Sequence, residues 1–158
     1  MRTANNLHLR DRHPYLCPKK SIFTRLVWDS DLEKRFIIFL ESCNDVVSFA
    51  KNCIRGIGFK LDYFNTIEGR ISHYYPDFIV KLVSKDKPQI VIVETKGIES
   101  LDVPLKMERL RQWCEDINAI QQDVCYSFVY VDQENFDKYS PQSFRELTRL
   151  FTEYQNSK

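Results

Sequence analysis

Apolar residues recur at helical intervals in three parts of the chain. Residues 30–43 show this spacing first, and Ser30 is a good N-cap for the helix that it predicts. A second helix is predicted over residues 104–120. A last amphipathic helix is predicted after Ser140 and Pro141, because a Ser N-cap followed by Pro at the first helical position is a common helix start.

Extended segments lie between and after these helices. They are rich in β-branched and aromatic residues and are bounded by Gly, Pro or turn residues. The third of them continues through Pro76 without interruption. Helices that alternate in this way with a run of strands predict an α/β fold, with a sheet flanked by helices. The predicted strands cover residues 46–51, 59–64, 71–83, 89–96 and 125–132.

The predicted strand 89–96 ends in charged residues. Its apolar stretch runs directly into Glu94, Thr95 and Lys96. Side chains alternate along a strand, so Glu94 and Lys96 point to one face and Thr95 points to the other. Because burial makes unpaired charge costly, this strand end needs an explanation.

The predicted hairpin brings a second carboxylate to the same place. If its turn centres on Asp86, Asp77 lies opposite residue 95, beside Glu94 and Lys96. Two neighbouring carboxylates repel each other unless a cation lies between them, and Mg²⁺ prefers oxygen ligands. A lysine beside its waters could orient a nucleophile or stabilise charge on a phosphate. A plain ion pair at a frayed strand end is the alternative, and both interpretations stay open here.

Five other residues suit either a function or a simpler structural role. Glu33 follows the Ser N-cap at the spacing of a capping box. Lys51 and Asn52 end a predicted strand, where they suit phosphate contact or an ordinary turn. Lys106 and Arg109 share one helix face, which suits DNA phosphates or simple exposure to solvent.

Composition limits the class of protein. The chain has 158 residues, a usual length for one domain, and 43% of them are hydrophobic. Its net charge is +1, so a polyanionic partner must be met by a local basic patch. Five cysteines without a CxxC motif favour free thiols in the cytoplasm over a disulfide framework. No apolar run is long enough for a transmembrane helix, so no membrane partner is expected.

The chain divides into two regions of different character. Residues 1–27 are basic and interrupted by Pro14 and Pro18, which predicts an irregular arm or linker. The periodic elements all lie within residues 28–158, which predicts one folded domain there.

Pro76-Asp77, followed by Glu94-Thr95-Lys96, resembles the motif of the PD-(D/E)xK nuclease superfamily. The chain is most similar to the C-terminal endonuclease domain of type III restriction enzymes and related helicase–nuclease proteins. Five segments in order carry this resemblance: SDLEKRF (30–36), VVSFAKN (46–52), YYPDFIV (74–80), VIVETKG (91–97) and RQWCEDIN (111–118).

The resemblance implies a restriction-endonuclease-like core (αβββαβ), with a mixed central sheet flanked by helices, and a metal-dependent DNA endonuclease. It assigns Mg²⁺, or alternatively Mn²⁺, to Asp77 and Glu94, with the Thr95 backbone carbonyl completing the site. Lys96 would position or polarise the attacking water. Glu33 would reach the metal through water, beyond any capping role.

The resemblance also implies partners. DNA would be the substrate, and Lys51 and Asn52 match a Lys-Asn pair of the family. In the larger proteins of the family a helicase or ATPase domain or subunit precedes the nuclease. This chain has no phosphate-binding GxxxxGK[ST] loop, so it would be either a domain of a longer protein or a free-standing relative. A double-strand cut would need two copies, in a homo-oligomer, or two visits. A nuclease fold that binds DNA or a protein without cutting, and a plain interaction domain, are the competing hypotheses.

Overall fold

The structure, a computed structural model, describes residues 14–52, 58–98 and 100–155, which form a mixed α/β fold. No helix in this part of the chain is long and apolar enough to cross a membrane. The helices are α1 (Asp31–Ser42), α2 (Val103–Ile120), α3 (Gln133–Tyr139) and α4 (Phe144–Leu150). The strands are β1 (Val46–Lys51), β2 (Leu61–Asn65), β3 (Arg70–Tyr74), β4 (Phe78–Leu82), β5 (Gln89–Lys96) and β6 (Cys125–Asp132).

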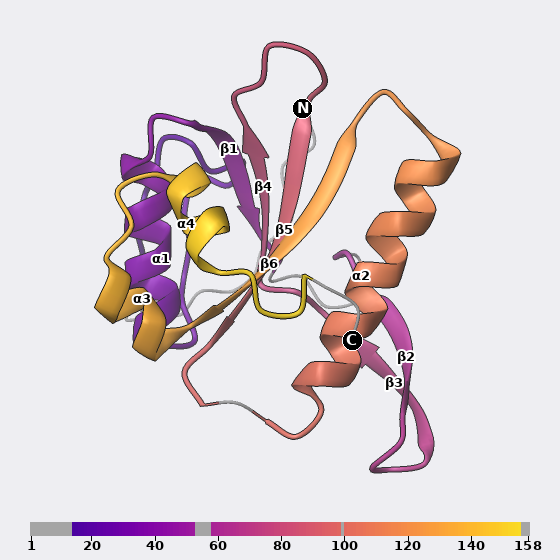
Figure 1. The fold of residues 1–158 in the computed structure, drawn as a ribbon. Coiled ribbons are helices and arrows are strands. Elements are labelled where there is room, and N and C mark those ends of the chain that lie inside the picture. Colours follow the sequence, from indigo (N-terminus) through magenta and orange to yellow (C-terminus); the bar gives the residue numbers. More distant parts are fainter. Residues whose placement is uncertain (1–13, 53–57, 99, 156–158) are drawn as a thin grey trace.

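A four-stranded sheet of order β1-β4-β5-β6 lies at the centre. The β1–β4 and β4–β5 pairs are antiparallel and the β5–β6 pair is parallel, so the sheet is mixed. Helices α1, α3 and α4 lie on one side of it, and α2 with the separate β2–β3 hairpin lies on the other (Figure 1). The expected fold class, a mixed sheet flanked by helices, is confirmed, and it is compatible with a restriction-endonuclease-like core.

Strand β5 is apolar on both faces because both faces are covered. Val91 and Val93 belong to the core under α1, α3 and α4, whereas Ile92 belongs to the core under α2. A strand buried on both sides reads as a continuous apolar run, as this one does. Glu94 continues the Ile92 side, so the sequence carries its carboxylate into the buried space beneath α2.

The strand predicted over residues 71–83 is wrong as a single element. β3 pairs only with β2, while β4 pairs with β1 and β5 in the central sheet. The chain leaves one sheet and enters the other at Tyr75-Pro76. Proline has no N–H to donate to a ladder, so it separates strands more readily than it continues one.

The start predicted for the last helix is also wrong. Ser140 ends α3 in the left-handed region (φ 43°), and Ser143 is the N-cap of α4. The Asp45 carboxylate accepts hydrogen bonds from the backbone N–H groups of Phe144 and Arg145, and this long-range cap fixes where α4 begins. Helix α3 was not predicted, although the Asp132 side chain caps it by accepting from the Asn135 N–H.

The described part of the expected arm, residues 14–27, contains no helix or extended strand but packs on the fold. Leu16 and Leu26 form a bridge with two backbone hydrogen bonds, and Leu26 is 2% exposed in the first core. Ser21 bridges to Phe49 of β1. Residues 1–13, which carry the rest of the predicted arm, lie outside the described residues.

The cysteines within the described ranges are free thiols, at positions 17, 43, 114 and 125. Burial raises the pKa of Cys43 and of Cys114 to about 12, so both thiols stay protonated near neutral pH. Cys53, the fifth residue of the free-thiol prediction, lies outside the described residues.

Candidate active site

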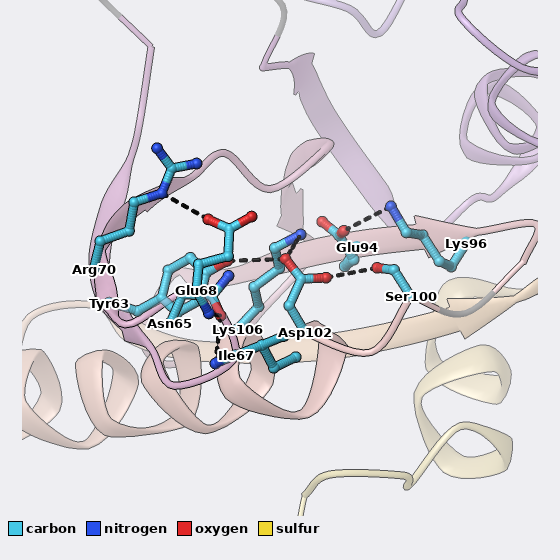
Figure 2. A network of polar contacts seen from close by, with 10 residues as sticks. All are labelled: Tyr63, Asn65, Ile67, Glu68, Arg70, Glu94, Lys96, Ser100, Asp102 and Lys106. Atoms are coloured by element: carbon cyan, nitrogen blue, oxygen red, sulfur yellow. Dashed lines mark hydrogen bonds and ion pairs between the residues drawn. The ribbon is translucent and has the colours of Figure 1, made fainter.

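The charged end of β5 lies on the side of the central sheet that α2 covers. Glu94 is 4% exposed, whereas the side chain of Lys96 is 31% exposed. The Lys96 Nζ and Glu94 Oε1 atoms are 3.9 Å apart, and Figure 2 shows the two side chains side by side on the strand. The expected common face is thus observed, with Lys96 at the edge and Glu94 inside.

Asp77 reaches the same strand end through the β4–β5 hairpin. The ladder pairs Phe78 with Val93, which places Asp77 beside Glu94, one residue from the predicted partner at 95. One carboxylate oxygen of Asp77, Oδ2, accepts hydrogen bonds from both the Thr95 N–H and the Thr95 hydroxyl, each at 2.7 Å. Thr95 therefore fixes the orientation of this carboxylate.

Both carboxylates hold protons more tightly than usual. Burial, reinforced by the charge of Asp77, raises the pKa of Glu94 to about 8. Burial and the charge of Glu33 raise the pKa of Asp77, against the opposing effects of the Thr95 hydrogen bonds and of Lys96. Two buried carboxyl groups in one place thus resist ionisation in the absence of a cation.

The environment of the Glu94 carboxylate indicates whether the end of β5 fits a metal ion. Within the described part of the chain, Glu94 Oε2 and the Tyr74 hydroxyl oxygen are buried and make no hydrogen bond of normal geometry, although the two side chains lie close enough for each to shift the pKa of the other. Burial and the charge of Glu94 raise the pKa of Tyr74 well above its ordinary value. A buried oxygen without a partner is costly, and a hard divalent cation on Glu94 Oε2 would remove that cost.

The protein would supply only part of such a coordination shell. Among the described residues, no three His, Cys, Asp or Glu side chains gather as a complete metal site. Two carboxylates, one backbone carbonyl and several waters are a set that Mg²⁺ accepts, because this ion keeps much of its hydration shell. The residues present therefore fit Mg²⁺ better than an ion that needs a full protein cage.

Glu33 is buried in an ion-pair cluster at the start of α1. The expected capping box is only half correct: Ser30 Oγ accepts from the Glu33 N–H, but Glu33 Oε2 accepts from the N–H of Asp29. The ammonium of Lys51 lies 2.8 Å from both Glu33 Oε2 and Asp29 Oδ2. Burial acts to lower the pKa of Lys51, but the bonds to Asp29 and Glu33 raise it, so the lysine stays charged.

Lys51 and Asn52 have structural partners that the sequence did not indicate. Lys51 is 4% exposed, and phosphate contact would require its two ion pairs to open. The Asn52 side chain donates to the carbonyls of Phe59 and Pro76 and accepts from the Phe59 N–H, while its own N–H donates to the Asp77 carbonyl. Lys51 therefore holds Glu33 at the start of α1, and Asn52 holds the chain around Asp77.

Lys106 and Arg109 lie on α2, as predicted, but only Lys106 faces the carboxylates. Its ammonium is 2.8 Å from Asp102 Oδ2, and its charge acts on Glu94. In Figure 2 it points between Asp102 and Glu94. Arg109 instead donates through Nε to the backbone carbonyl of Asp62 on the hairpin.

Two further residues belong to this neighbourhood. Asp102 is the N-cap residue of α2, but its side chain makes no capping hydrogen bond and accepts instead from Ser100 and Tyr63. The spacing of Asp102 and Lys106, four residues apart, was a usable signal for their ion pair. No local signal connects Tyr63 to them, because it lies on the distant hairpin.

The mixed α/β fold is compatible with a restriction-endonuclease-like domain, and a comparison with known families agrees. A family model described as an endonuclease domain matches residues 19–118, more than half of the chain. The chain belongs to this family of endonuclease domains. Membership implies a hydrolase with nuclease activity on DNA, and the matched range contains all the candidate site residues discussed above. Neither a curated protein nor a solved structure matches the chain.

Proposed function

We propose that the protein is a Mg²⁺-dependent endonuclease that hydrolyses DNA phosphodiester bonds at Asp77, Glu94 and Lys96. The observation that carries this proposal is the buried, unpartnered Oε2 atom of Glu94 beside a second buried carboxylate, in a chain of an endonuclease family. Asp77, Glu94 and the Thr95 backbone carbonyl would hold the ion, with Mn²⁺ as an alternative. When bound, the ion would lower the pKa of a coordinated water and neutralise phosphate charge.

The side chains around the ion have separate tasks. Thr95 holds one oxygen of Asp77, so only the other remains to face a ligand. Lys96 lies at the solvent-exposed edge, where its ammonium can orient the attacking water and stabilise charge that develops on the phosphate. Glu33 raises the pKa of Asp77 through its charge, and we propose that it reaches the ion through water.

DNA would bind mainly along α2. Arg109, and Lys106 once its ion pair with Asp102 opens, would offer cations to the phosphates that flank the scissile bond. We propose that Lys51 and Asn52 contribute to DNA binding chiefly by holding Glu33 and Asp77 in place, since their polar groups are already bonded.

We further propose a place for the domain in a larger system. The resemblance to type III restriction enzymes and helicase–nuclease proteins assigns it an upstream helicase or ATPase domain or subunit. In this arrangement residues 1–27 would lie between the motor and the nuclease domain, residues 28–158, with residues 14–27 packed against that domain. Cleavage of both strands would use two copies of the single site in a homo-oligomer, in the cytoplasm.

Nicking of supercoiled plasmid DNA tests the proposal. The wild type should cut in Mg²⁺ and stop in EDTA. Glu94→Gln should abolish cleavage, and Lys96→Ala should reduce it by about 10²–10³-fold, as expected for loss of an electrostatic stabiliser. Lys81→Ala, at an exposed lysine on the far end of β4, controls for net charge and should cut normally.

The same experiment separates the competing functions. DNA binding without turnover in the wild type would favour a non-cleaving binding module. Cleavage by Lys96→Ala at the wild-type rate would make Lys96 an ordinary surface residue and would remove the proposed catalytic set.

A further inference from the structure

A lysine on α2 points toward Glu94, but its ion pair is with Asp102 (Figure 2). The ammonium of Lys106 acts on Glu94 through its charge, and the Lys106 side chain is only 17% exposed. Glu94 Oε2 nevertheless has no hydrogen-bond partner among the described residues. Lysine has a flexible four-carbon stem, so something must hold Lys106 away from the carboxylate.

Asp102 holds it. The Asp102 Oδ2 atom is 2.8 Å from the Lys106 ammonium, one helical turn away on α2. Although burial acts to raise the pKa of Asp102, bonds from Lys106, Ser100 and Tyr63 hold that pKa well below its ordinary value. Asp102 thus binds the Lys106 ammonium on the side of α2 that faces Glu94 (Figure 2).

Asp102 is itself fixed from two sides. The Ser100 hydroxyl donates to Oδ1 at 2.7 Å, and the Tyr63 hydroxyl donates to Oδ2 at 2.9 Å. Tyr63 is 6% exposed on β2, and burial together with the bond to Asp102 raises its pKa to about 12, so it remains a donor.

The hairpin that carries Tyr63 has a well-defined turn. The side-chain carbonyl of Asn65 accepts from the N–H groups of Ile67 and Glu68, and Gly69 adopts the positive φ that the turn requires. The anchor on Asp102 therefore comes from a rigid element outside the central sheet.

We propose that Asp102, anchored by Tyr63 and Ser100, is a positioning residue that keeps Lys106 off Glu94. This arrangement leaves one carboxylate oxygen of Glu94 open for the metal ion. The inference rests on the proposed function, because it concerns the same site, and it makes the β2–β3 hairpin part of the catalytic unit.

Metal affinity measured by calorimetry in the full chain tests this inference. In Asp102→Asn the ammonium of Lys106 is released and should pair with Glu94, so Mg²⁺ affinity should fall about tenfold. Lys106→Ala alone should bind Mg²⁺ as tightly as the wild type or slightly more tightly. The double variant Asp102→Asn/Lys106→Ala should regain the affinity of Lys106→Ala, because the competing cation is gone.

Tyr63→Phe is a milder perturbation of Asp102 than Asp102→Asn, because it removes one hydrogen bond and leaves every charge in place. It should weaken Mg²⁺ binding about threefold, and this loss should also disappear in the Lys106→Ala background. Tyr139→Phe, at a tyrosine half exposed on α3, is the matched control and should change nothing. Urea unfolding of each variant separates this effect from loss of the fold.

The outcomes distinguish failure of the positioning role of Asp102 from failure of the proposed endonuclease function. Unchanged Mg²⁺ affinity in Asp102→Asn, or a loss that persists in the double variant, would overturn the positioning role while leaving the proposed endonuclease intact. A wild-type chain that binds no Mg²⁺ would overturn the proposed function and this inference with it.

Discussion

The buried carboxylate of Glu94 should make the metal-free protein less stable as the pH rises. Its pKa is raised from 4.5 to about 8, a difference of about 3.5 pH units. Between these two values the folded chain keeps a proton that the unfolded chain has lost. The folded state then binds more protons, so the free energy of unfolding falls with increasing pH.

The magnitude follows from the size of the shift. Each pH unit in this window costs up to about 1.4 kcal/mol, so the full window costs at most about 5 kcal/mol. This is a large share of the roughly 5–15 kcal/mol that stabilises a typical domain. Glu94→Gln cannot ionise and should therefore be several kcal/mol more stable than the wild type in EDTA at about pH 8.

Urea unfolding in EDTA, at intervals between about pH 5 and pH 8, measures both slopes. The wild type should lose stability steeply across this range, while Glu94→Gln should show a much shallower slope because residue 94 no longer titrates. Glu134→Gln, at an exposed carboxylate on α3, should keep the wild-type slope. Parallel curves for the wild type and Glu94→Gln would refute the reasoning.

Three further predictions concern the supports of the site and its contact with DNA. Lys51→Met should lower the free energy of unfolding, measured with urea, by about 3 kcal/mol, because Glu33 loses its buried counter-ion. Unchanged stability would mean that the ion pair is dispensable and that Lys51 is available for phosphate contact. Asn52→Ala should cost about 1–3 kcal/mol and weaken Mg²⁺ binding, because the side-chain hydrogen bonds to Phe59 and to Pro76, the residue before Asp77, are lost. DNA binding in Ca²⁺ should weaken steeply between about 50 and 200 mM salt, since a chain of net charge +1 grips phosphates through a local patch; salt-independent affinity would contradict this.

Local sequence patterns predicted the central parts of the fold and of the site. Strand β5 could be recognised because both of its faces are covered, which leaves an apolar run that ends in Glu94. Alternation along the strand then placed Lys96 on the same face. The position of Asp77 was predicted to within one residue, because the register of a hairpin depends on turn geometry that a sequence shows only approximately.

Contacts between distant residues could not be predicted in this way. Tyr63 and Asp102 meet across 39 positions, and nothing local to either residue marks the hydrogen bond between them. The start of α4 depends on Asp45, about 100 residues upstream. Lys51 looks like a phosphate contact until the fold places it beside Glu33, where burial decides its partners.

Calorimetric titration of Mg²⁺ into the wild type, Glu94→Gln and Lys96→Ala tests the central claim most directly. Because Glu94 is proposed as a direct ligand, Glu94→Gln should lose measurable Mg²⁺ binding. Lys96→Ala removes a cation near the ion and should bind Mg²⁺ as tightly as the wild type or slightly more tightly. Equal affinity in Glu94→Gln and the wild type would contradict the account, because the buried carboxylate at the end of β5 would then not be a metal ligand.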